Sequence, residues 1–194
     1  MTPPSTREEI VAAARRLFYE RGFQTTSLGE VARAASVPKG NFYYHFQTKD
    51  DLLRAVLSAR RADIERALER WAADLPMPLD RLRRFVRMVT SERERLTQYG
   101  CPTGSMLTEL GKKHEALLAD ARAILDLYVQ FATRAFADLG HDATRATILG
   151  ARLMGRAQGA ILLAHAYADP TLLDREIEDI ERWIESEAEG SAGP

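Results

Sequence analysis

The stretch Ser27–Lys49, SLGEVARAASVPKGNFYYHFQTK, predicts two short helices separated by a tight turn. Ser27-x-x-Glu30 has the sequence of a capping box, so the first helix should begin at Leu28. Pro38 suits the first turn of the second helix, because a missing N–H group costs no hydrogen bond there. Such short helices are not stable alone in water, so other parts of the chain must hold them in place.

The second short helix carries a cation, an amide, two phenols and an imidazole on its open side. Phe42 and Phe46 are expected to point inward, and the open side consists of Lys39, Gly40, Asn41, Tyr43, Tyr44 and His45. A helix that presents so many hydrogen-bonding groups is suited to a polar, anionic partner. Double-stranded DNA is therefore the first candidate.

These residues resemble the helix-turn-helix of the TetR family of bacterial transcriptional regulators. The phrase KGNFYYHFQTKDDL, residues 39–52, is among the most specific signatures of that family, and the resemblance extends from about Thr6 to Val56. It implies a DNA-binding set of Thr25, Thr26, Ser27, Ser36, Lys39, Gly40, Asn41, Tyr43, Tyr44, His45 and Lys49. The resemblance implies phosphate contacts for Thr25 and Thr26, although the two residues also suit a plain polar loop.

Apolar residues recur at helical spacing through most of the chain, and no strand pattern occurs. Thr6-x-x-Glu9 and Thr48-x-x-Asp51 have the sequence of further capping boxes, and the second should begin a long connecting helix. The predicted fold is all-α: a three-helix helix-turn-helix head, residues 6–66, joined by that connecting helix to a helical effector-binding and dimerisation bundle, residues 67–188.

Length and composition indicate a globular protein of the cytoplasm. The chain has 194 residues, 45% of them hydrophobic and 28% charged, and contains one cysteine. We find no apolar run near the roughly 20 residues needed to span a bilayer, and the N-terminus lacks the apolar segment of a signal peptide. We therefore expect no membrane partner and no disulfide framework.

Charge is distributed unevenly along the chain. Residues 1–61 hold 10 Lys and Arg against 6 Asp and Glu, a balance of +4. The remainder holds 17 against 22, a balance of −5, which gives the total of −1. A basic N-terminal segment on an acidic remainder fits a DNA-binding head, although ordinary scatter would also produce a difference of this size.

An enzyme is not expected. The histidines at positions 45, 114, 141 and 165 have no metal-ligand spacing with one another or with Cys101, so we expect no metal and no cofactor. The sequence also lacks a Walker loop, a GxSxG elbow and an HExxH motif.

Two C-terminal segments suggest a homodimer. Gly155 and Gly159 place small residues four positions apart, a spacing that lets two helices approach closely. The last helix carries a stripe of large apolar residues, and the TetR family pairs two such helices from each subunit. The predicted dimer interface is Gly155, Gly159, Ile177, Ile180, Trp183 and Ile184. A close contact within one chain is the alternative.

Aromatic, methionine and cysteine side chains of the expected bundle are candidates for an effector pocket. They are Phe85, Met88, Cys101, Met106, Tyr128, Phe131, Met154 and Tyr167. Such residues equally form ordinary core, but helical bundles commonly bind small ligands between their helices. Cys101 is either a small packing residue or a reactive thiol near the start of a short helix.

The sequence thus predicts a homodimeric transcriptional repressor, released from a pseudo-palindromic operator by an unknown small-molecule effector. The alternatives are a helical small-molecule-binding protein or enzyme that has lost DNA binding, and a transcriptional activator.

Overall fold

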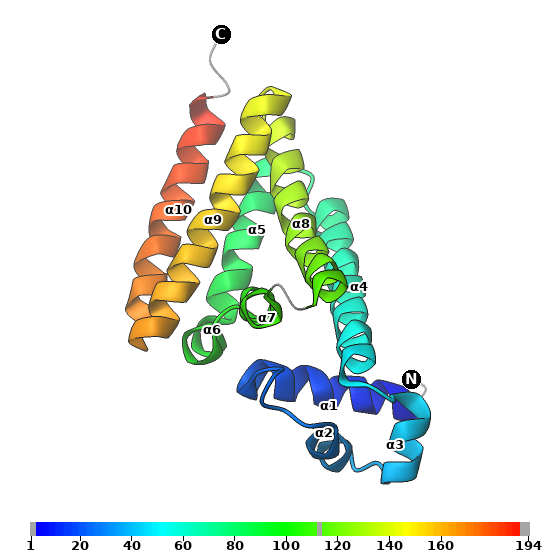
Figure 1. Ribbon diagram of the computed structural model, residues 1–194. Coiled ribbons are helices and arrows are strands. Elements are labelled where there is room, and N and C mark those ends of the chain that lie inside the picture. Colours follow the sequence, from blue (N-terminus) through cyan, green and yellow to red (C-terminus); the bar gives the residue numbers. More distant parts are fainter. Residues whose placement is uncertain (1–2, 112–113, 191–194) are drawn as a thin grey trace. The chain divides into compact units, whose positions relative to one another are not determined.

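The computed structural model describes residues 3–111 and 114–190, which form helices joined by turns and short loops (Figure 1). These residues contain no strand, which confirms the all-α prediction. The helices are α1 (Thr6–Arg21), α2 (Leu28–Ala34), α3 (Lys39–His45), α4 (Lys49–Asp74), α5 (Pro78–Ser91), α6 (Arg93–Tyr99), α7 (Pro102–Leu110), α8 (Glu115–Asp138), α9 (Ala143–Tyr167) and α10 (Pro170–Gly190). Among the described residues, no helix has the combined length and hydropathy of a membrane span.

The chain divides into two compact units, each made of two stretches of sequence. Unit 1 combines Met1–Asp63 with Pro102–Ile124, and unit 2 combines Ile64–Cys101 with Leu125–Pro194. Helix α7 and the first part of α8 therefore belong with α1, α2 and α3. Helices α4 and α8 each begin in unit 1 and continue into unit 2.

Helix α1 begins one residue earlier than the predicted capping box implies. Ser5 is the N-cap, its hydroxyl accepting from the Glu8 amide and the Glu8 carboxylate accepting from the Ser5 amide. The predicted Thr6–Glu9 box is therefore wrong by one position. Gly22 ends the helix at φ 90°, a conformation that favours glycine, and its N–H donates to the Phe18 carbonyl.

Unit 1 has an aromatic core formed by the predicted inward-facing residues. Phe23 folds back onto α1 and meets the Phe18 ring edge-on, with centroids 5.2 Å apart. Phe42 and Phe46 of the α3 segment are 1% and 3% exposed. Burying these rings in the core of unit 1 supplies the stability that a seven-residue helix lacks by itself.

Local signals set the geometry of the helix-turn-helix. Ser27 and Glu30 form the predicted capping box of α2, and hydrogen bonds from Ser27 lower the pKa of the Glu30 carboxyl. Ser36 takes φ 57° in the turn, which redirects the chain from α2 to α3. Thr48 and Asp51 cap α4 as predicted, the Thr48 hydroxyl lying 2.6 Å from the Asp51 carboxylate.

Unit 2 packs α5, α6, α9 and α10 with the second part of α8 around one apolar core. Helix α5 ends at Ser91 and α6 begins at Arg93, with a break in the helix at Glu92. At Gly150, α9 approaches α8 closely. A Cβ atom at this position would lie 2.8 Å from the Thr133 backbone nitrogen and 3.0 Å from the Val129 carbonyl oxygen.

Candidate nucleic-acid interface

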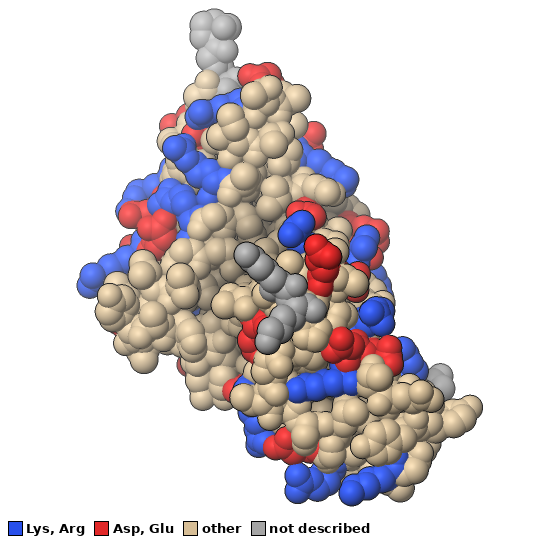
Figure 2. Space-filling view, in the orientation of Figure 1, with Lys and Arg blue, Asp and Glu red and all other residues tan. Residues whose placement is uncertain are grey.

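Helix α3 presents the polar side predicted from the sequence. Lys39, Gly40 and Asn41 are exposed in its first turn, and Tyr43 and Tyr44 are 49% and 83% exposed. Large aromatic side chains are unusual in so open a position. Figure 2 shows Lys and Arg side chains at the edge of unit 1 beside α2 and α3. The surface therefore combines positive charge with donors that can reach an extended anion.

The hydroxyl groups of Thr25, Thr26 and Ser27, just before α2, form hydrogen bonds with other residues of unit 1. Thr25 donates to the Arg21 carbonyl, while Thr26 is 1% exposed and donates to the Gly22 carbonyl at 2.8 Å. The Ser27 hydroxyl donates to the Glu30 carboxylate at 2.8 Å. These three side chains fix the end of α1 and the start of α2. Ser36 is exposed in the turn that follows.

Lys49 is directed toward the loop that follows α1. Its ammonium group donates to the Gln24 carbonyl at 3.0 Å and lies 4.6 Å from the centroid of the Phe23 ring. Partial burial lowers the pKa of Lys49 below its ordinary value, and the Glu109 and Asp50 carboxylates partly offset that change.

Helix α7 also contacts this loop, through Glu109. The Glu109 carboxylate accepts from the Gln24 backbone N–H at 3.0 Å and lies beside Gly22. At the start of α8, His114 Nδ1 lies 3.2 Å from the Asp50 carboxylate. The loop before α2 and the first turn of α4 are thus both tied to the second stretch of unit 1.

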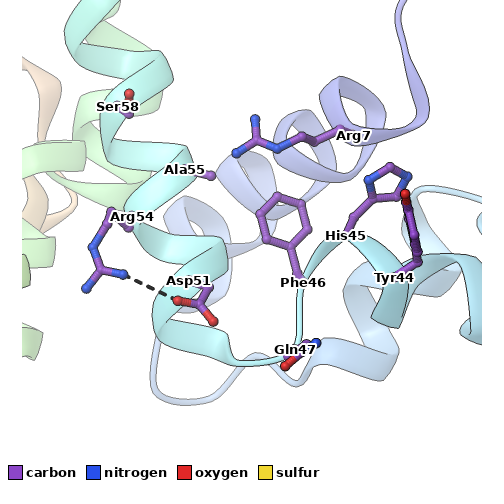
Figure 3. A pocket seen from close by; sticks show the side chains of 9 residues that line it. All are labelled: Arg7, Tyr44, His45, Phe46, Gln47, Asp51, Arg54, Ala55 and Ser58. Atoms are coloured by element: carbon purple, nitrogen blue, oxygen red, sulfur yellow. Dashed lines mark hydrogen bonds and ion pairs between the residues drawn. The ribbon is translucent and has the colours of Figure 1, made fainter.

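A cavity of about 480 Å³ lies beside the end of α3, where α1 and α4 meet it (Figure 3). It is lined by Arg7, Tyr44, His45, Phe46, Gln47, Asp51, Arg54, Ala55 and Ser58. Tyr44 and His45 belong to the predicted DNA-binding set, whereas Arg7, Gln47 and Arg54 do not. Arg7 and His45 are 38 positions apart, so no spacing in the sequence could have linked them.

The residues predicted to bind an effector occupy several places. In unit 2, Phe85 and Met154 are core residues, and Met88, Cys101 and Tyr128 pack against the same core. The others do not join them: Phe131 lies 6.0 Å from the Trp71 ring, Met106 belongs to unit 1, and Tyr167 is 72% exposed. Within the described residues, no group of three His, Cys, Asp or Glu side chains is placed to hold a metal ion.

A second cavity, of about 430 Å³, opens in unit 2 between α6 and the junction of α9 and α10. Arg93, Thr97 and His165 contribute to its lining, and none of the predicted effector residues does. Its polar side chains also make contacts that connect the helices of unit 2. Arg93 forms an ion pair with Asp174, and the His165 ring lies 3.1 Å from the Thr97 carbonyl oxygen.

The residues predicted at a dimer interface fall into two groups. Ile177, Ile180 and Ile184 fill the core of their own unit at 6% exposure or less, and Trp183 packs on Phe136 with centroids 5.7 Å apart. These α10 side chains are thus occupied within the chain. Gly155 and Gly159 of α9 differ, because a Cβ atom at either position would meet nothing within 4 Å.

Comparison with known proteins identifies both parts of the chain. Residues 10–56 match the model described as bacterial regulatory proteins of the tetR family. Residues 78–178, about half of the chain, match the model for the C-terminal domain of LmrA/YxaF-like transcriptional regulators.

Individual relatives match over different lengths. The transcriptional regulator AcuR of Cereibacter sphaeroides is 33% identical over 61% of this chain and 53% of its own length. The transcriptional repressor DhaR of a Mycobacterium species is 27% identical over 67% of this chain and 65% of its own. For these relatives, therefore, the matched part spans about half to two thirds of their length. TtgR of Pseudomonas putida is 28% identical over 93% of this chain and 89% of its own.

Solved structures agree with the fold over nearly the whole chain. A TetR regulator from Legionella pneumophila superposes with a TM-score of 0.82 at 21% identity, covering 94% of this chain and 98% of its own. A regulatory protein TetR from Rhodobacter sphaeroides gives 0.77 at 26% identity, covering 91% and 97%. The family models, the relatives and the exposed helix-turn-helix agree: this chain belongs to the TetR family of DNA-binding transcriptional regulators, which are not enzymes.

Proposed function

We propose that this protein is a homodimeric repressor, released from a pseudo-palindromic operator by a small-molecule effector. The observation that carries the proposal is the first turn of α3, where Lys39, Gly40 and Asn41 are all exposed. The first turn of a recognition helix is the part that reaches base edges in the major groove. DhaR, to which this chain is similar, is a transcriptional repressor, and this supports the proposed direction of regulation.

Within α3, the side chains divide into two roles by their chemistry. The Lys39 ammonium can donate to guanine O6 and N7, and the Asn41 amide can pair with adenine through two hydrogen bonds. Tyr43 and Tyr44, exposed further along the helix, can donate to phosphates. Phosphate contacts set the register of the protein on the duplex, and base contacts select the sequence.

The exposed face of α9 is the surface we propose for dimerisation. Ile148, Leu162 and Leu163 are 53%, 64% and 51% exposed, and Gly155 and Gly159 lie between them. The spacing of these residues puts them on one side of the helix. A partner helix can approach closely at the glycines and bury the apolar residues on either side of them.

For the effector, we propose the apolar cluster of unit 2 around Phe85 and Tyr128, whose rings lie 5.9 Å apart. Met88 and Met154 adjoin this core, and methionine adapts readily to a ligand. The effector must bind one conformation more tightly than the other to shift the balance between them. In a dimer, any change that moves two recognition helices away from a separation of about 34–36 Å weakens binding to successive major grooves.

Selection of duplexes from a randomised pool, followed by transcription in vitro from a promoter carrying the selected site, tests this function. We expect a palindromic sequence bound by two chains, and less transcript when the protein is present. An enriched site without symmetry, one chain per site, or a rise in transcript would contradict the proposal.

A further inference from the structure

The cavity at the end of α3 has a lining suited to an anion. It lies between the start of α1, the end of α3 and the first turns of α4, and Figure 3 shows Arg7 extending over Phe46 toward α4. The Arg7 guanidinium lies 5.2 Å from the centroid of the Phe46 ring, which is itself 3% exposed. The cation is thus positioned by an aromatic face.

Arg7 has no carboxylate partner in this cavity. Asp51, the acidic residue of the lining, is engaged by Arg54 at 3.3 Å and by the Thr48 hydroxyl at 2.6 Å. The Arg7 guanidinium makes no hydrogen bond to any residue within 3–111 or 114–190, so its five N–H groups remain available.

Three further polar side chains line the same cavity as Arg7. The Tyr44 hydroxyl, the His45 ring and the Gln47 amide line the same cavity, and none of them is hydrogen-bonded within the part of the chain that the structure describes. The planar Arg7 guanidinium presents N–H groups that match the oxygens of a phosphate group, and hydroxyl and amide side chains occur elsewhere in the same lining. The cavity is open to solvent, so a phosphate that is part of a polymer can enter it.

The position of the cavity relative to the first turn of α3 fits a DNA backbone. Lys39 and His45 are six residues apart on one helix, a rise of about 9 Å. The major groove is about 12 Å wide, so a helix whose first turn contacts the bases brings its last turn near the sugar-phosphate backbone at the edge of the groove. Arg7 adds a contact that helix α3 cannot supply alone.

We propose that the cavity binds one phosphate of the DNA backbone, with Arg7 as its principal ligand and Tyr44 and Gln47 as additional donors. This inference rests on DNA binding by α3 under the proposed function. It assigns to α1 a part in fixing the register of the head on the duplex, independent of base sequence.

The test compares Arg7→Gln with Arg16→Gln, a matched change on the same helix whose residue already pairs with Glu20 at 3.6 Å. Binding to the selected site and to a random duplex is measured by fluorescence anisotropy over a series of salt concentrations. Each phosphate contact contributes about 0.9 to the slope of log K against log salt. We expect Arg7→Gln to reduce the slope by about 0.9 for each bound head, equally on both duplexes, and Arg16→Gln to leave it unchanged.

Two further variants keep the result interpretable. Arg7→Lys retains the charge, so most of the slope should remain. Tyr44→Phe removes one donor from an 83% exposed side chain and should weaken binding to both duplexes alike without affecting the fold. Circular dichroism establishes that each variant is folded. If Arg7→Gln unfolds the head, uniform weakening by Tyr44→Phe supports the site, and unchanged binding by that variant overturns it.

Other outcomes separate this inference from the proposed function. If the wild-type protein selects no DNA site, the proposed function fails. If it selects a site but folded Arg7→Gln has the slope of Arg16→Gln, only the phosphate site fails. Calorimetric titration with inorganic phosphate tests the other source of the ligand. Binding of free phosphate that depends on Arg7, with an unchanged DNA slope, would also overturn the inference.

Discussion

Replacing Gly150 by alanine tests the close contact of α8 and α9 in unit 2. The new Cβ atom would lie 2.3 Å from the Thr133 hydroxyl oxygen, 2.8 Å from the Thr133 backbone nitrogen and 3.0 Å from the Val129 carbonyl oxygen. The hydroxyl can rotate away, but the two backbone atoms cannot. The helices must therefore separate, and the buried side chains of the unit 2 core around them must lose contact.

Two opposing effects determine the size of the change. Overpacking of this kind costs about 1–3 kcal/mol, and contact with backbone atoms puts this site toward the upper end. Alanine is favoured over glycine inside a helix by about 1 kcal/mol, which offsets part of that cost. We expect Gly150→Ala to lower the free energy of unfolding by about 1–2 kcal/mol.

Gly155→Ala is the matched control, because it makes the same change in the same helix at a position where the new Cβ atom would meet no atom beyond its own helical turn within 4 Å. Within the protomer it should gain the helix preference of alanine without a clash, and because Gly155 also lies on the surface proposed for dimerisation, association must be followed separately. Urea unfolding followed by circular dichroism measures both variants, and sedimentation detects any change in association. A Gly150→Ala protein as stable as the wild type would refute the argument from close approach.

Three further predictions concern the DNA, the dimer and pH. Asn41→Ala should cost about 1–3 kcal/mol on the selected site and nothing on a scrambled duplex, as measured by anisotropy; equal loss on both would remove Asn41 from base reading. Gly159→Leu should yield monomers in sedimentation with an unchanged far-ultraviolet spectrum, because the side chain meets open space within the protomer; an intact dimer would place the interface elsewhere. Because burial lowers the pKa of Lys49 in the folded state, the unfolded state binds more protons just below pH 10.5, so stability should rise with pH there. Lys49→Met should flatten that part of the curve of unfolding free energy against pH, and an unchanged curve would argue against the burial of Lys49.

Capping signals were predictable from the sequence because they act over three or four residues. The Ser27–Glu30 and Thr48–Asp51 pairs both form at the positions that the sequence predicts. The start of α1 was misplaced because Ser5-x-x-Glu8 and Thr6-x-x-Glu9 offer the same pattern one residue apart. The pattern alone does not decide between two overlapping boxes.

Contacts between distant residues were not predictable in the same way. Periodicity marks Ile177, Ile180 and Ile184 as one apolar face, but it does not say whether that face meets the same chain or a second copy. The hydrogen bond from Gln24 to Glu109 joins residues 85 positions apart. For the same reason, the sequence did not predict the cavity that is lined by both Arg7 and His45.

Unit 1 is built from two separate stretches of sequence, and this limits how its DNA-binding head can be fused to another protein. A chimera joined at one crossover within α4 would import the recognition helix without its native 102–124 stretch. Gln24 would then lose Glu109, Asp50 would lose His114, and Arg60 would lose the buried Thr103 hydroxyl that it now contacts at 3.2 Å. Transplanting this head onto another sensor therefore requires two grafted segments and compatible sequence at each of their junctions.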